Sequence, residues 1–143
     1  MSTNVKKSTI KEIAKEIAIG NTCYIQMTTK KVTTIDHSIE DTKLIAAQEE
    51  IQAELEQKVE NYIKIEKLSA EDKRVIMEYF LEELPDRSVR KELSNALNRK
   101  NPTRNFNKVV ESDIDLNQHW RNFKSEEYQR WVSNFIADAY LYH

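Results

Sequence analysis

The stretch that decides the fold is TIKEIAKEIAIGNTCYIQMTTKKVTTI, residues 9–35, because the spacing of its apolar residues changes midway. The first half places apolar residues three or four positions apart, which predicts an amphipathic helix. Thr9, with Glu12 three residues later, predicts a capping box at its start, and Gly20 predicts its C-terminal end. The predicted apolar face comprises Ile10, Ile13, Ala14, Ile17 and Ala18.

The second half alternates apolar and other residues, which predicts two short strands, at 23–27 and 32–35. Thr28 to Lys31 supply a four-residue connection, so the two strands are expected to form an antiparallel β-hairpin. A two-stranded hairpin is marginally stable by itself, so we expect it to lie against a helix. Residues 62–65, YIKI, alternate in the same way and favour a short third strand.

A long polar helix is predicted over residues 39–59, with Asp36 or Ser38 as its N-cap. Its apolar stripe is narrow, and glutamates cover the other faces, so we expect it to be peripheral or to pack on a partner. The stripe comprises Leu44, Ala47, Ile51, Leu55, Val59 and Tyr62, and the glutamates are Glu49, Glu50, Glu54, Glu56 and Glu60.

Caps and prolines divide the C-terminal half into further helices. Ser69 with Asp72 predicts the start of one helix, which Pro85 ends, and Asp86 caps the next, which Pro102 ends. The first of these carries Val75, Ile76, Tyr79, Phe80 and Leu84, and the second is expected to bury Val89, Leu93, Ala96 and Leu97.

The last segment is aromatic. A short turn is predicted from Asn105 through Phe106, Val109 and Val110, and the final helix is expected to have a new cap at Ser125 and Glu126. Aromatic residues at helical spacing are usually core residues, so we interpret this face as core and not as a stacking surface. It comprises Tyr128, Trp131, Val132, Phe135, Ile136, Ala139 and Tyr140.

These elements predict a single α+β domain over residues 1–143, with residues 1–8 disordered. The predicted fold is mainly helical: one N-terminal helix, a small antiparallel β-hairpin with the short third strand, and then four or five packed helices.

Several classes of site are excluded by composition. Gly20 is the one glycine, so neither a Walker-type phosphate loop, a G-x-G-x-x-G turn nor a G-x-S-x-G elbow is present. Cys23 is the one cysteine, and no C-x-x-C or H-x-x-x-H spacing occurs, so we expect no disulfide, no metal and no cofactor.

The chain also lacks the patterns of targeting and membrane insertion. No apolar run approaches the roughly 20 residues of a membrane span, and the polar N-terminus does not resemble a signal peptide. We therefore expect a cytoplasmic protein with no membrane partner.

Three runs in the C-terminal half carry a family resemblance: DRSVRKELSNALNRKNPTRNF (86–106), HWRNF (119–123) and EEYQRWVSNFI (126–136). They resemble a small bacterial family of uncharacterised proteins, numbered one-five-eight in the UPF series. The family signature A-L-x-x-x-x-P-x-R-x-F, followed by W-x-x-F, falls here on Ala96, Leu97, Pro102, Arg104, Phe106, Trp120 and Phe123.

The chain departs from that family at two places. Lys30 and Lys31 stand in the hairpin turn, where the family usually has a glycine, and Thr103 stands where it often has an aromatic residue. The resemblance covers most of the chain and implies the order of elements, with a hairpin between the first helix and the later ones. It implies no activity.

The segment 86–108 is the most concentrated functional candidate. It holds seven basic residues against Asp86 and Glu92, a local net charge of +5, with five asparagines interleaved. Guanidinium and amide groups around a proline-broken loop suit phosphate oxygens. The candidate binding residues are Arg87, Arg90, Lys91, Arg99, Lys100, Arg104 and Lys108, and the asparagines are Asn95, Asn98, Asn101, Asn105 and Asn107.

Several interpretations of this charge stay open. The run can be a solvated helix end, or Arg104 can pair with a carboxylate of the polar helix. As a site, it favours a non-enzymatic binding or adaptor protein with an unidentified protein partner. The first alternative is a nucleic-acid or phosphate-ligand module. The second is a hydrolase or transferase built around His119, with Cys23 as a further isolated candidate group.

Overall fold

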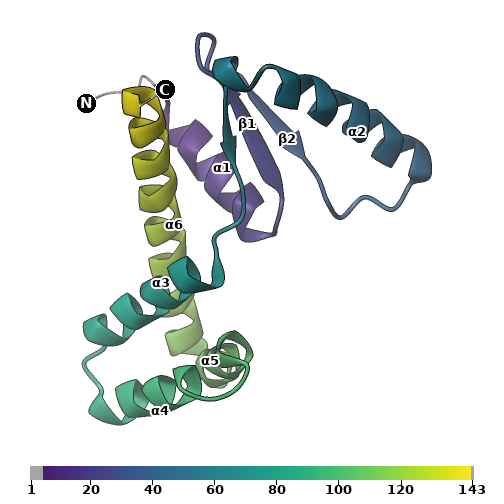
Figure 1. Cartoon of the computed structure of the whole chain (residues 1–143). Coiled ribbons are helices and arrows are strands. Elements are labelled where there is room, and N and C mark those ends of the chain that lie inside the picture. The colour runs from purple at the N-terminus through teal and green to yellow at the C-terminus, as the bar shows by residue number, and fades with distance from the viewer. Residues whose placement is uncertain (1–4, 143) are drawn as a thin grey trace. The chain divides into compact units, whose positions relative to one another are not determined.

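The computed structural model describes residues 5–142, and Figure 1 shows its elements. The predicted α+β class, mainly helical with a small antiparallel sheet, is confirmed. These residues group into two compact units: unit 1 holds residues 5–67 and 128–142, and unit 2 holds residues 68–127. A single domain over 1–143 stays a prediction, and residues 1–4 of the predicted disordered end lie outside the described residues.

Unit 1 begins with α1 (Lys7–Ala18), which starts earlier than the sequence predicts. The carbonyl of Lys6 accepts the first helical hydrogen bond, from the Ile10 amide, and no side chain caps the helix. The prediction of Thr9 as N-cap is therefore wrong, and Lys7 and Ser8 lie within the helix. Neither Lys7 nor Ser8 is a helix-breaking residue, so the helix begins two residues before Thr9. The amides of its first turn have no side-chain cap.

The predicted C-terminal end of α1 at Gly20 is confirmed. Gly20 has φ +96°, its amide donates to the Ile17 carbonyl, and the Asn21 amide donates to the Glu16 carbonyl. This pair of bonds around a left-handed residue is a Schellman motif. Only glycine enters that conformation without steric cost, so Gly20 directs the chain from the helix into the sheet.

The sheet has three antiparallel strands in the order β2-β1-β3, which confirms both the hairpin and the third strand. They are β1 (Thr22–Gln26), β2 (Val32–Ile35) and β3 (Tyr62–Ile65). In the hairpin turn Lys30 takes the left-handed conformation, with φ 65°. The position that calls for glycine is thus occupied by a lysine, whose Nζ donates to the Met27 carbonyl at 2.7 Å.

The central strand β1 is buried on both faces. Tyr24 points to one face, where it forms a cluster with Ile35 and Leu55. Cys23 and Ile25 point to the other face, and α1 packs against the same strand. The predicted packing of the hairpin against a helix therefore holds.

The polar helix is α2 (Thr42–Gln57), and it begins later than predicted. Asp41 is its N-cap and accepts from the amides of Lys43 and Leu44, so the prediction of Asp36 or Ser38 is wrong. Asp36 instead accepts from the Ser38 amide and hydroxyl, which closes a local turn before the helix. Of the predicted stripe within α2 only Leu55 is buried, so the helix is peripheral to unit 1.

Polar contacts hold α2 to the sheet where apolar ones are few. The Tyr24 hydroxyl donates to Glu56 Oε1 at 2.6 Å, and Lys64 Nζ lies 2.6 Å from the same oxygen. The Lys64 ammonium, and then the Tyr24 hydroxyl, lower the pKa of Glu56, whereas burial raises the pKa of Tyr24. A 3-10 turn, η1 (Val59–Asn61), then leads into β3.

Unit 2 consists of α3 (Ala70–Glu83), α4 (Arg87–Leu97), α5 (Pro102–Glu111) and the first part of α6 (Ile114–Tyr142), whose last part belongs to unit 1. The predicted caps are confirmed: Ser69 accepts from the Asp72 amide, and Asp86 accepts from the amides of Ser88 and Val89.

Two predictions for this half are wrong. Residues 102–111 form a full helix rather than a short turn from Asn105, because Pro102 occupies a first helical position, where it needs no amide partner. The last helix runs unbroken through Ser125 and Glu126, since a serine or glutamate inside a helix does not by itself end it.

Aromatic rings form the core of unit 2. The ring centroid of Phe80 lies 6.3 Å from that of Phe106, 5.1 Å from Trp120 and 5.3 Å from Phe123. Phe106 and Trp120 meet edge to face at 4.8 Å. The quadrupole of an aromatic ring favours tilted and edge-to-face contacts of this kind. The cluster therefore packs α3, α5 and the start of α6 against one another.

Candidate functional site

The seven basic residues of segment 86–108 all lie in unit 2, on one helix pair and the turn that joins it. Arg90 is partly buried and the other six are exposed. Residues 98–101 join the two helices and are here called the α4–α5 turn. Arg87, Arg90 and Lys91 lie on α4, Arg99 and Lys100 lie in the α4–α5 turn, and Arg104 and Lys108 lie on α5.

The basic side chains of this segment have no ion-pair partner within unit 2, although residues 68–127 as a whole carry twelve acidic against eleven basic residues. None of the seven side chains forms an ion pair with a carboxylate of residues 68–127. Of the two acids in the segment, Asp86 accepts two backbone amides as the cap of α4. The predicted pairing of Arg104 with the polar helix, now α2, joins different units and stays a prediction.

The α4–α5 turn is short and held by internal hydrogen bonds. Asn101 adopts the left-handed conformation, with φ 60° and ψ 58°, and Pro102 starts α5 directly after it. Asn105 Nδ2 donates to the Lys100 carbonyl at 2.8 Å. In Figure 1, α4 lies across the view while α5 is seen nearly along its axis, so the two helices cross steeply.

Two arginines join α3 and α4 reciprocally. Arg74 of α3 donates to the Leu97 carbonyl at 2.7 Å and to Asn98 Oδ1 at 3.1 Å, at the C-terminal end of α4. Arg90 of α4 donates to the Leu84 carbonyl at 2.6 Å, just past the end of α3. A cation at a helix C-terminus satisfies carbonyls that have no helical partner, so each arginine caps the other helix.

We expect Arg90→Ala to lower the free energy of unfolding by about 1–2 kcal/mol, because the carbonyls of Leu84 and Pro85 lose their charged donor. Arg87→Ala removes the same charge from an exposed position of the same helix, and should change stability by less than about 0.5 kcal/mol. Chemical denaturation of both variants checks this, and equal stabilities would contradict the capping role of Arg90.

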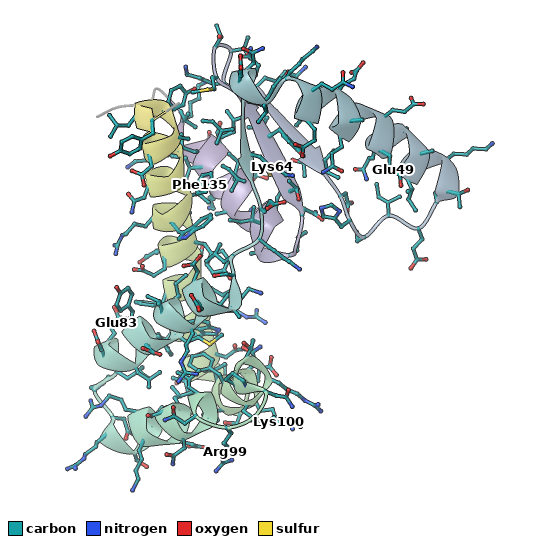
Figure 2. The ribbon with its side chains drawn as sticks, viewed as in Figure 1. Glu49, Lys64, Glu83, Arg99, Lys100 and Phe135 are labelled. Carbon is teal, nitrogen blue, oxygen red and sulfur yellow. The ribbon has the colours of Figure 1, made fainter. Side chains whose placement is uncertain are left out.

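The seven residues divide between two open grooves and the α4–α5 turn. One groove, of about 1070 Å³, runs between α3 and α4, and Arg87, Arg90 and Lys91 line it with Glu82 opposite. The other, of about 820 Å³, runs beside α5 and is lined by Arg104 and Lys108. Arg99 and Lys100 extend outward from the turn between them (Figure 2). Six of the seven are therefore exposed donors spread over two grooves and the turn, and Arg90 is used by the fold.

His119 and Cys23, the candidate catalytic groups, both contact neighbouring side chains. His119 Nε2 lies 2.8 Å from Glu83 Oε2, and its ring packs against Phe80 with centroids 5.0 Å apart. Cys23 is buried, its Sγ lies 3.7 Å from Thr34 Oγ1, and burial raises the pKa of its thiol. A raised pKa keeps the Cys23 sulfur protonated and weakly nucleophilic, so Cys23 is not an activated nucleophile, whereas His119 does have a carboxylate, Glu83, within hydrogen-bond reach.

Sequence reasoning missed the role of Arg74 and of Asn105. The role of Arg74 could not be recognised from the sequence, because its side chain donates to a carbonyl that lies 23 residues away in the chain. Asn105 carried a weak signal, since it follows Pro102 by three residues within a new first helical turn.

Two further features, a metal-ligand cluster and a membrane-crossing helix, are absent from residues 5–142. No three histidine, cysteine or acidic side chains of these residues lie close enough together to hold a metal ion. Within the same range, no helix has both the length and the apolar character needed to cross a bilayer.

The comparisons with known proteins give one match. A family model described as an uncharacterised protein family, UPF0158, matches residues 5–141. No curated protein matches the chain. No solved structure matches it either.

Proposed function

We propose, for a chain that belongs to the uncharacterised protein family UPF0158, that unit 2 binds nucleic acid through α4, the α4–α5 turn and α5. The observation that carries the proposal is a run of exposed basic side chains, without ion-pair partners in residues 68–127, on two steeply crossed helices. A short turn between two helices that cross steeply is the arrangement of a helix-turn-helix, in which the second helix faces the nucleic acid.

The charge distribution supports a phosphate-rich ligand. Segment 86–108 has a net charge of +5, although the whole chain has −2. Nucleic acid offers a regular line of phosphates, and each lysine or arginine that contacts one releases a condensed counterion. The two grooves and the turn present six exposed cations along one continuous segment, which suits an extended polyanion better than a single small phosphate ligand.

The turn is also pre-organised for binding. Arg74 fixes its first residue through Asn98, and Asn105 fixes it again through the Lys100 carbonyl. Arg99 and Lys100 therefore project from a backbone that is already ordered, and less conformational entropy is lost when they contact a ligand.

The adaptor hypothesis is a second candidate with an observation of its own. Leu44 and Ile51 of α2 are 55% and 44% exposed, although both are apolar. An exposed apolar strip of this kind suits a protein partner, and its binding would survive moderate salt. A protein partner of this kind would bind to unit 1 and not to the basic segment 86–108.

The test is the salt dependence of binding to a short duplex, measured by fluorescence anisotropy with the full chain. We expect the logarithm of the association constant to fall linearly with the logarithm of salt between about 50 and 200 mM, with a slope of about −0.9 for each phosphate contact. Lys43→Ala, which removes an exposed cation from α2, should leave the slope unchanged. Absent binding at the lowest salt, or a slope near zero, would refute the proposal.

A further inference from the structure

One face of α5 is polar and unused by the fold. Phe106 and Val110 are buried on one side of the helix, while the adjoining side, on which Asn107 is half-buried, lines a groove that also includes Ala70 at the start of α3. The side chains on that side make no hydrogen bond or ion pair within residues 68–127, in contrast to Asn105 on the same helix. They are Thr103, Arg104, Asn107, Lys108 and Glu111.

We propose that the ligand is B-form double-stranded DNA, and that α5 lies in its major groove with Arg104 and Asn107 contacting base edges. The inference rests on the proposed function and adds the type of nucleic acid and the residues that read its sequence. Arg99 and Lys100, in the turn before α5, contact phosphates at the edge of that groove.

The dimensions of α5 favour this form of nucleic acid. An α-helix with its side chains is about 10–12 Å wide, and the major groove of B-DNA is about 12 Å wide. The major groove of A-form RNA is deep and too narrow for side chains to read. The steep crossing lets α5 enter the groove while α4 stays above the phosphate backbone, which its N-terminal cations Arg87 and Lys91 can contact.

The chemistry of the two side chains fits base edges. Arginine donates two hydrogen bonds to O6 and N7 of guanine, and asparagine both donates to and accepts from adenine at N6 and N7. Arg104 and Asn107 are three residues apart on a helix, a rise of about 4.5 Å. That rise is close to the spacing of about 3.4 Å between stacked base pairs, so the two side chains reach neighbouring pairs.

The face from Arg104 to Glu111 spans about 10 Å along the helix, which limits what one chain can read. At about 3.4 Å for each base pair this length covers roughly three pairs. We therefore expect a short preferred motif that contains a guanine next to an adenine.

The experiment is a selection of duplexes from a randomised pool by the full chain, followed by anisotropy titrations of the enriched duplex, a scrambled duplex and the matching RNA duplex. We expect the enriched DNA to bind at least tenfold more tightly than both others. Arg104→Ala should weaken the enriched duplex by about 10- to 100-fold and the scrambled duplex far less. Lys100→Ala should weaken both DNA duplexes by the same factor.

The outcomes separate this inference from the function on which it rests. Salt-dependent binding without an enriched motif, or equal binding of the RNA duplex, would overturn the reading role of α5 and leave the proposed function standing. Equal weakening of both duplexes by Arg104→Ala would do the same. If the unmodified chain binds none of the duplexes, both this inference and the proposed function are overturned.

Discussion

Replacement of Phe80 by alanine should lower the free energy of unfolding by about 3–5 kcal/mol, the usual cost of truncating a buried phenylalanine. Phe80 is 0% exposed and its ring contacts Phe106, Trp120 and Phe123. The cavity left by the ring would be lined by aromatic groups that are held by two other helices, α5 and α6, so it cannot collapse without moving a backbone. Tryptophan fluorescence during denaturation is a direct readout, because Trp120 lies 5.1 Å from the ring that is removed.

The neighbouring Tyr79 provides the matched control. It is 52% exposed on the same helix, so Tyr79→Ala removes a similar ring without opening a cavity. Its effect on stability should stay within about 0.5 kcal/mol. A cost below about 1.5 kcal/mol for Phe80→Ala would show that the cluster is not the core of unit 2.

Removal of four cations together should have the largest effect on binding. The variant replaces Arg87, Lys91, Arg99 and Lys100 by alanine. At 0.1 M salt each phosphate contact contributes about 0.9 log units through counterion release, so loss of four contacts weakens nonspecific duplex binding on the order of 10³-fold. The slope of log affinity against log salt should become shallower by about 3.6 over the same titration.

Stability and total charge need separate controls for this variant. The four side chains are exposed and have no ion-pair partner in unit 2, so the circular dichroism spectrum and the unfolding midpoint should not change. A second variant with Lys7, Lys11, Lys31 and Lys43 replaced by alanine loses the same charge from unit 1 and should keep its affinity. Similar weakening by both variants would mean that the overall charge of the chain, and not the basic segment 86–108, determines binding.

Local physics explains which elements were predictable. The end of α1 at Gly20, the hairpin, the third strand and the caps at Ser69 and Asp86 all depend on residues a few positions apart in the chain. Such short-range patterns express turn chemistry and side-chain alternation directly.

The errors have the opposite origin. Thr9 and Ser125 are both good caps by type, but neither caps a helix here, because the preceding residues also form stable helix. A capping residue is only a preference, and helix formation on both of its sides overrides it. The predicted start of α2 was wrong for a related reason: four acidic or hydroxyl residues lie within residues 36–41, and Asp41 rather than Asp36 is the N-cap.

The candidate site was visible as charge but not as geometry. Seven basic residues in 86–108 can be counted in the sequence, yet the count treats Arg90 like the others, although its guanidinium is used by the Leu84 carbonyl. It also gives no reason to separate Asn107, which is half-buried and lines the groove beside α5, from Asn105, whose side chain donates to the Lys100 carbonyl. Only the register of α5, set by Phe106 and Val110, decides which polar side chains face outward.

The exchange of caps by Arg74 and Arg90 limits how far this protein can be shortened for structural work. A peptide of α4, the turn and α5 alone would carry the whole positive segment, but it would leave the end of α4 without the donor that α3 supplies. It would also lack Phe80 and Trp120, against which Phe106 packs. The smallest fragment worth expressing therefore runs from Ser69 to Phe123, and isolated two-helix peptides are poor substitutes in crystallisation or NMR titration.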